Sequence, residues 1–141
     1  MKRSILMLIA IVTCICVTLS VATLAAGVKF TDVPDGSWYY DAVYWAVDEG
    51  VTNGTSETTF SPDNVCSRAE AVTFIWRALG SPEVGDVTNP FTDIEVGSWY
   101  YKAVLWAVDN NVTSGTSATT FSPTMECSRA QIVTFLYKAY N

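Results

Sequence analysis

Apolar residues are distributed differently in the first 26 residues and in the rest of the chain. Lys2 and Arg3 precede an almost unbroken apolar run from Ile5 to Val21, and small residues follow at Ala25 and Ala26. A basic start, an apolar middle and a small-residue end predict an export signal peptide over residues 1–26. The run is also long enough to cross a bilayer, which takes about 20 residues, so an uncleaved signal anchor is the alternative.

After this segment, apolar residues recur with the 3.6-residue period of amphipathic helices. From Trp38 to about Glu49, the side chains of Ala42, Trp45 and Ala46 share one face, which predicts a first helix. A Gly/Thr/Ser-rich turn follows, with room for at most a very short strand around residues 59–60.

A second helix is predicted to open at Ser67, where Ser-Arg-Ala-Glu has the spacing of a capping box. In a capping box the side chains of Ser67 and Glu70 satisfy backbone N–H groups that the helix leaves free, so we assign both to capping. The same reasoning assigns Ser128 and Gln131 to a second cap. An apolar stripe then runs along the helix at Val72, Ile75, Trp76 and Leu79.

This pattern occurs twice. Phe30–Gly80 aligns with Phe91–Asn141 at a constant offset of 61 residues (91 minus 30), without insertion or deletion. Such internal similarity predicts helix–loop–helix repeats that bury their apolar faces against each other. We therefore expect a first repeat over residues 28–80, a polar linker over 81–90 and a second repeat over 91–141.

The repeats resemble the S-layer homology (SLH) domain family, whose pattern combines F-x-D, a Trp, a G-x-x-x-x-F-x-P loop and a T-R-A-E helix start. The first repeat matches it at Phe30, Asp32, Trp38, Gly54, Phe60, Pro62 and Ser67-Arg68-Ala69-Glu70. The second repeat matches it at Phe91, Asp93, Trp99, Gly115, Phe121, Pro123 and Ser128-Arg129-Ala130-Gln131. The chain departs from the pattern in carrying serine for threonine in both copies and glutamine at position 131.

The resemblance implies a mainly α fold, with the SLH repeats packed as a partial pseudo-threefold bundle and ligand grooves between them. It also implies an exported protein of the cell surface, cell wall or S-layer that binds secondary cell-wall polysaccharide, often pyruvylated. Members of the family commonly carry three copies, whereas this sequence shows two. The alternative is therefore an assembly protein that pairs with itself or with another SLH protein to complete a bundle.

Charge and composition narrow the classes of function. Beyond residue 26 the chain carries six basic and fourteen acidic residues, a net charge of −8, which argues against nucleic acid and anionic lipid as partners. The sequence contains no histidine, which removes Ser–His and Cys–His catalysis. No Cys/His cluster or calcium-loop spacing is present, so we expect no enzyme, no metal and no cofactor.

Two arginines are the leading candidates for ligand contact. Arg68 and Arg129 fall in the first turn of their helices, where a guanidinium beside free N–H groups suits a carboxylate such as that of a pyruvyl ketal. The alternative is a structural pairing of each arginine with Asp32 or Asp93. On the ligand interpretation, replacing either arginine by alanine weakens wall binding and leaves the fold intact.

The remaining candidates have structural alternatives of similar weight. Trp38 and Trp99 are suited to stacking on sugar rings, although a core position is slightly favoured, and Trp45 and Trp106 are expected in the core. The loops at residues 53–56 and 114–117 offer hydroxyls and backbone groups to a polysaccharide, or their glycines serve only to permit a positive φ. The predicted polysaccharide-binding residues are Arg68, Arg129, Asp32, Asp93, Trp38, Trp99, Gly54 and Gly115.

Cys66 and Cys127 occupy equivalent positions just before the capping serines. In an exported protein a pair of cysteines invites a disulfide. We favour the alternative, in which both side chains are buried packing groups.

Overall fold

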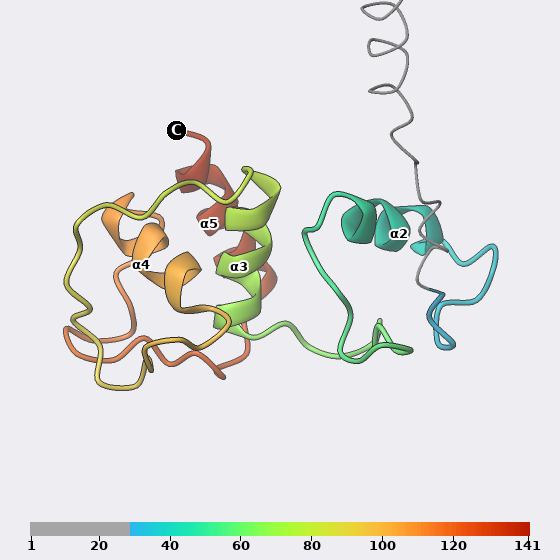
Figure 1. The fold of residues 1–141 in the computed structure, drawn as a ribbon, viewed down its shortest axis with the longest axis horizontal. Helices are drawn as coiled ribbons and strands as arrows, with labels where there is room; N and C mark the ends of the chain where they lie inside the picture. Colours follow the sequence, from blue (N-terminus) through green and yellow to red (C-terminus); the bar gives the residue numbers. More distant parts are fainter. Residues whose placement is uncertain (1–28) are drawn as a thin grey trace, which may run out of the picture.

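The computed structural model describes residues 29–141 and is mainly helical, as predicted (Figure 1). Each repeat contributes two helices, and the pairing of strands in this part of the chain is limited to an isolated antiparallel bridge between Ser67 and Glu126. The helices are α2 (Tyr40–Asp48), α3 (Arg68–Ala78), α4 (Tyr101–Asp109) and α5 (Arg129–Ala139). None of these helices is long and apolar enough to cross a membrane, and the predicted signal peptide lies outside the described residues.

The second helix of each repeat begins at a capping box. The Ser67 hydroxyl accepts the Glu70 N–H, and a Glu70 carboxylate oxygen accepts the Ser67 N–H at 2.8 Å. Ser128 and Gln131 repeat the arrangement at the start of α5. The first helices begin two residues later than the apolar pattern suggested and have no side-chain cap.

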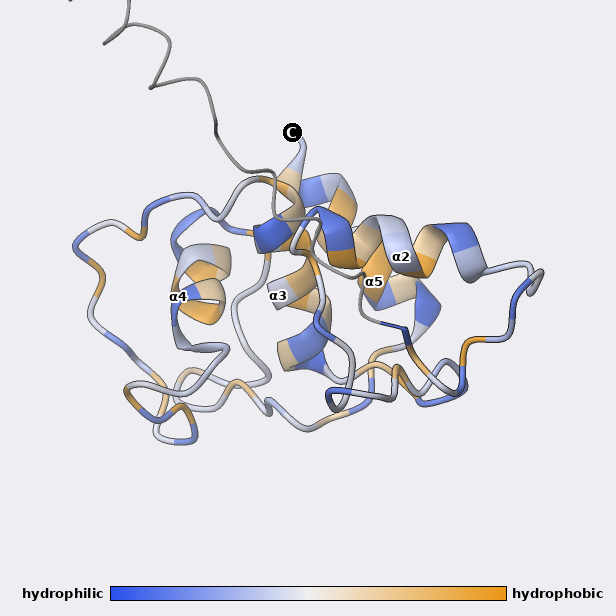
Figure 2. Ribbon diagram, turned by 45° about the vertical axis from the view of Figure 1, so that its right-hand side comes forward, coloured by the Kyte–Doolittle hydropathy of each residue, from blue (hydrophilic) through white to orange (hydrophobic). Residues whose placement is uncertain are grey.

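The helices form two bodies whose boundary does not coincide with the boundary between the repeats. Helix α3 belongs to the first repeat by sequence, yet it packs against α4 and α5 of the second repeat (Figure 1). We call residues 67–141 the three-helix body and residues 29–60 the α2 lobe. Figure 2 shows the hydrophobic and hydrophilic segments that alternate along these amphipathic helices.

Each body has its own core. The core of the three-helix body draws buried side chains from α3, α4, α5 and the loops of the second repeat: Ala71, Val72, Ile75, Phe91, Ile94, Ala103, Val104, Trp106, Ala107, Val112, Phe121 and Phe135. The α2 lobe has a smaller core of Phe30, Val33 and Val43, surrounded by partly buried aromatic side chains. The larger body therefore buries most of the apolar surface that drives folding.

Backbone hydrogen bonds attach the start of α3 to the second repeat. The first N–H groups of a helix have no partner within the helix. Here Arg68 N–H donates to the Met125 carbonyl at 2.8 Å, and Ala69 N–H donates to the Pro123 carbonyl at 3.0 Å. These bonds and the apolar face of α3 together place the helix in the core of its neighbour. The wider pseudo-threefold arrangement stays a prediction.

The structure corrects three of the tryptophan predictions. Trp106 lies in the core, as expected, at 5% exposure, but the equivalent Trp45 on α2 is 58% exposed. Helix α3 covers α4, and no helix among the described residues covers the same face of α2. The core position favoured for Trp38 and Trp99 is also wrong, because these side chains are 93% and 56% exposed.

Candidate functional site

In both repeats an aspartate at the start of the repeat holds the end of the loop between the helices. The two carboxylate oxygens of Asp32 accept the N–H groups of Phe60 at 2.8 Å and Ser61 at 2.7 Å. The hydrogen bond from Phe60 lowers the pKa of Asp32. Asp93 binds the equivalent N–H groups of the second repeat at 2.9 and 2.7 Å. Neither aspartate is within ion-pair distance of an arginine in residues 29–141, so the alternative interpretation, in which each arginine pairs with Asp32 or Asp93, is wrong.

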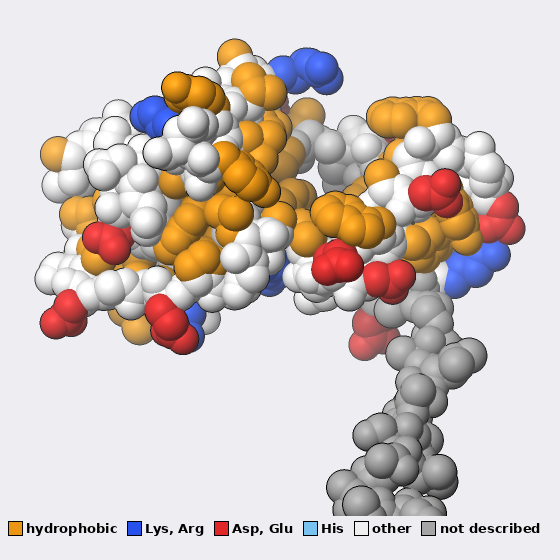
Figure 3. All heavy atoms as spheres, turned by 90° about the horizontal axis from the view of Figure 1, so that it is seen from above, with side chains coloured by type: hydrophobic (Ala, Val, Ile, Leu, Met, Phe, Trp, Pro, Cys, Tyr) orange, Lys and Arg blue, Asp and Glu red, His pale blue; other side chains and the backbone are white. Residues whose placement is uncertain are grey.

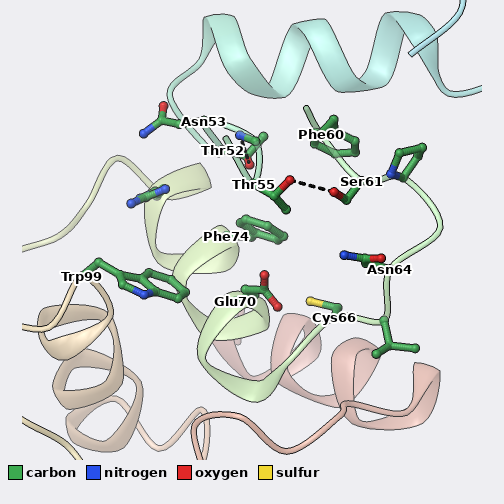
Figure 4. A pocket seen from close by; sticks show the side chains of 14 residues that line it. Thr52, Asn53, Thr55, Phe60, Ser61, Asn64, Cys66, Glu70, Phe74 and Trp99 are labelled. Carbon is green, nitrogen blue, oxygen red and sulfur yellow. Dashed lines mark hydrogen bonds between the residues drawn. The ribbon is translucent and has the colours of Figure 1, made fainter. Parts of the chain in front are cut away.

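The loop between the helices requires glycine. Gly54 has φ +78°, and a Cβ at this position would lie 2.6 Å from the Thr59 carbonyl oxygen and 2.6 Å from the Phe30 ring. Loop hydroxyls bond to one another, including Thr55 Oγ1 to Ser61 Oγ at 2.7 Å (Figure 4). The glycine lets the loop close onto the aromatic core, and the hydroxyl network fixes its outer edge.

Arg68 is buried between the two repeats. Its side chain is 4% exposed; Nε donates to the Phe121 carbonyl at 3.0 Å, and Nη2 donates to Thr113 Oγ1 at 2.9 Å. The guanidinium carbon lies 4.9 Å from the centroid of the Phe121 ring and 5.2 Å from that of Phe135. Burial lowers the pKa of Arg68 from its usual value. These four contacts hold a cation at the junction, and contact of Arg68 with polysaccharide stays a prediction.

Arg129, the equivalent of Arg68, lies at the start of α5 and is exposed. The two arginines therefore have the same local sequence and different surroundings. The prediction that they play one common role was based on sequence position alone, and the structure separates a buried member from an exposed one.

A groove lies between the loop of the first repeat, helix α3 and Trp99 of the second repeat (Figure 4). Its volume is about 630 Å³. Of the predicted site residues, the groove brings together Gly54, Glu70 and Trp99, and it does not include the two arginines, the two aspartates, Trp38 or Gly115.

The wall of the groove mixes polar and aromatic groups that suit a sugar. The side chains around Trp99 and Glu70 include two amides, loop hydroxyls, two phenyl rings and one cation, namely Asn53, Asn64, Thr52, Thr55, Ser61, Phe60, Phe74 and Arg77. Flat aromatic surface beside amides and hydroxyls can stack on a sugar ring and bond its hydroxyls.

Arg77 is a groove residue that the sequence did not predict. Its Nη1 donates to the Val51 carbonyl at 3.3 Å, and the side chain is partly buried at the groove. The available signal was a basic residue in the last turn of both second helices, Arg77 and Lys138. Such residues complement the helix dipole, so the pattern alone does not indicate a site.

The two cysteines are neighbours in space and are partly buried as free thiols beside the main core, in agreement with the packing role. Cys127 N–H donates to the Cys66 carbonyl at 2.9 Å, next to the bridge between Ser67 and Glu126. Burial raises the pKa of Cys66 to about 11, and it raises that of Cys127 as well. In residues 29–141 no group of three or more His, Cys, Asp or Glu side chains is placed to hold a metal ion.

The S-layer homology domain family matches the chain twice, over residues 29–72 and 90–133. The chain belongs to the S-layer homology domain family. Each of the two matches covers one loop, its aspartate and the start of one second helix.

Related SLH proteins are surface proteins of much greater length. The chain is 34% identical over 122 residues to a surface-layer 125 kDa protein of Lysinibacillus sphaericus, covering 86% of the chain and 10% of that protein. It is 31% identical over 116 residues to the S-layer protein sap of Bacillus anthracis, covering 82% of the chain and 14% of that protein. A cellulosome-anchoring protein of Acetivibrio thermocellus is 29% identical over 118 residues, with 81% of the chain and 26% of that protein covered. The SLH chain is accordingly a secreted cell-surface protein.

Proposed function

We propose that the SLH chain is a non-catalytic anchor that binds anionic secondary cell-wall polysaccharide, of the pyruvylated type, in the groove between its repeats. The observation that carries the proposal is the position of Trp99. This half-exposed indole from the second repeat forms one side of a groove whose other sides come from the first repeat. A sugar bound there contacts both repeats at once.

An anionic ligand is favoured by the positive charge of Arg77 in the groove and opposed by the net negative charge of the chain. The chain beyond residue 26 has a net charge of −8, so the overall field opposes an anion. Arg77 is the cation in the groove, and a guanidinium offers paired donors to a carboxylate. Glu70 also lines the groove, but its carboxylate already accepts the N–H and the hydroxyl of Ser67.

The test is co-sedimentation of residues 27–141 with purified cell walls, before and after removal of their secondary polysaccharide. Wild-type chain is expected to pellet with intact walls and to stay in solution with stripped walls. Trp99→Ala and Arg77→Gln are each expected to weaken binding about tenfold, because each removes one contact worth roughly 1–2 kcal/mol.

Matched controls come from the other repeat. Trp38→Ala and Lys138→Gln change the equivalent residues outside the groove. They retain wild-type binding if the groove is the site. Equal losses in Trp38→Ala and Trp99→Ala contradict a single groove and favour the broader set of contacts predicted from sequence. If the folded wild-type chain does not co-sediment with intact walls, the proposal that the chain is an anchor is wrong.

We propose assembly as a second function, because the apolar face of α5 is uncovered in residues 29–141. An exposed apolar face of this kind is suited to pairing with another SLH repeat.

A further inference from the structure

The contact between α3 and α4 shows how one SLH repeat packs against the next. Val72 and Ile75 of α3 are 0% and 5% exposed and lie in one core with Val104 and Trp106 of α4. This contact joins the second helix of the first repeat to the first helix of the second repeat. The contact therefore joins an apolar face of α3 to an apolar face of α4.

Helix α5 carries the same apolar face as α3, and among residues 29–141 this face is uncovered. The positions equivalent to Val72 and Ile75 are Val133 and Leu136, which are 60% and 40% exposed. Tyr137 and Tyr140 extend this apolar face and are exposed as well. We call these four residues the α5 face. Figure 3 shows hydrophobic side chains gathered on the surfaces of both bodies.

Helix α2 carries part of the face with which α4 contacts α3, and this part is uncovered among residues 29–141, while Val43, the equivalent of Val104, is buried in the core of the α2 lobe. Ala103 and Trp106 of α4 are buried, whereas the equivalent Ala42 and Trp45 of α2 are exposed. We call Ala42, Trp45 and the partly buried Ala46 the α2 face. Residues 29–141 thus expose the α3-type half and part of the α4-type half of a contact that the chain already makes once internally.

The residues that surround Arg68 in the contact between α3 and the second repeat also have equivalents in the first repeat. Arg68 is held by Thr113, Phe121 and Phe135 of the second repeat. The equivalents of these three residues are Thr52, Phe60 and Phe74, and all three line the groove. The groove, at about 630 Å³, is far larger than a guanidinium, so an arginine at the Thr52–Phe74 side leaves room beside it.

Arg129 is the equivalent of Arg68 and could occupy the place beside Thr52, Phe60 and Phe74 that Arg68 occupies beside Thr113, Phe121 and Phe135. Like Arg68 it follows a capping serine at the start of an 11-residue helix, but it is exposed. The N–H groups of Arg68 and Ala69 bond to the carbonyls of Met125 and Pro123. Among the described residues the equivalent N–H groups of Arg129 and Ala130 have no such carbonyl partners.

We infer that two copies of the chain associate head to tail, with the α5 face of one copy on the α2 face of the other and Arg129 inserted between Thr52, Phe60 and Phe74. This inference rests on the assembly function proposed above and identifies the partner as a second copy. The contact is heterologous, since it joins two different surfaces, so it builds rings or open chains of copies.

The experiment is sedimentation velocity of residues 27–141 over a range of concentrations, in the absence of cell walls. Val133→Asp blocks the α5 face, and Trp45→Asp blocks the α2 face. Both side chains are exposed, so both variants are expected to keep the helical circular dichroism of the wild type. Val96→Asp is the matched control, because Val96 is exposed outside both faces and its equivalent in the first repeat is Asp35.

Wild-type chain and Val96→Asp are expected to associate as concentration rises. Val133→Asp and Trp45→Asp alone are expected to remain monomeric, with association weakened more than about tenfold by a charge buried in an apolar contact. An equimolar mixture of the two blocked variants restores one intact contact and gives a heterodimer. Arg129→Ala added to the Trp45→Asp member weakens that heterodimer.

Three results overturn the inference. Monomeric wild-type chain at every concentration means that a second copy does not cover the α5 face. Association by Trp45→Asp alone means that α5 pairs with α5. A mixture that stays monomeric excludes the head-to-tail contact. Failure here is separate from failure of the anchor, because no polysaccharide is present and the Val133→Asp variant leaves the groove intact for the co-sedimentation assay.

Discussion

Replacing Arg68 by alanine tests whether the buried guanidinium joins the two repeats. The substitution removes hydrogen bonds to the Phe121 carbonyl and to the Thr113 hydroxyl. It also leaves a space between two phenyl rings whose centroids lie 4.9 and 5.2 Å from the guanidinium carbon. The structure therefore predicts a loss of stability, in contrast to the intact fold expected from the sequence.

The expected loss in the free energy of unfolding follows from the buried groups that lose a hydrogen-bond partner. A buried polar group left unsatisfied costs about 1–3 kcal/mol, and Arg68→Ala leaves two. The unfilled space adds roughly 1 kcal/mol, while removing a desolvated charge returns part of the total. We expect the free energy of unfolding to fall by about 3 kcal/mol, which lowers the melting temperature by roughly 10–20 °C for a domain of this size.

The assay is urea unfolding of residues 27–141, followed by tryptophan fluorescence and far-ultraviolet circular dichroism. Arg129→Ala is the matched control, because it changes the equivalent residue where it is exposed, and it is expected to cost less than about 0.5 kcal/mol. Arg68→Lys retains the charge but has no fork to reach both acceptors, so its stability falls between alanine and wild type. Equal unfolding free energies for Arg68→Ala and Arg129→Ala would refute the structural role of Arg68.

Two further predictions concern the loop and the thiols. Gly115→Ala places a Cβ 2.6 Å from the Thr120 carbonyl oxygen at φ +82°, whereas at Gly97, the control position, φ is +87° and no atom lies within 4 Å. Gly97→Ala is expected to cost roughly 1–2 kcal/mol, and Gly115→Ala is expected to cost more because of the added clash. Equal losses of stability in thermal unfolding would contradict the steric argument. The pKa of Cys66 is raised from 9.0 to about 11 by burial, so at pH 8 iodoacetamide is expected to alkylate it about a hundredfold more slowly in the folded chain than in urea. Because the folded state holds this proton more tightly, stability is expected to fall as pH rises from about 9 to 11, and rapid alkylation of folded Cys66 would show that the thiol is not protected.

Local features of the fold could be predicted from the sequence with good accuracy. The repeat, its two helices, the capping serines and the glycine loop all depend on neighbouring residues, and a period of 3.6 or a capping-box spacing reports such short-range physics. The family resemblance, carried by the same motifs, is confirmed by the two domain matches.

Packing between repeats could not be predicted, because equivalent residues have nearly identical local sequences. Trp45 lies in VYWAVD and Trp106 in VLWAVD, yet only Trp106 is buried. The difference comes from α3, which covers α4 and leaves α2 open. Arg68 and Arg129 differ for the same reason, since Phe121 and Thr113 of the second repeat accept hydrogen bonds from Arg68, and Arg129 has no equivalent acceptors among residues 29–141. Hydrophobic periodicity identifies the apolar face and not its partner.

The second helix of the first repeat packs in the core of the second repeat, so the boundaries of the duplicated sequence differ from the boundaries of the packed core. Cutting the chain in the linker at residues 81–90 would separate α3 from the core that it completes. A boundary just before Cys66 would instead keep α3, α4 and α5 together. Domain exchange among surface proteins of this family would therefore preserve cores best when the junction falls inside a repeat, between its two helices. Each exchanged segment would then keep the second helix of one repeat together with the first helix of the next, as α3 stays with α4 here.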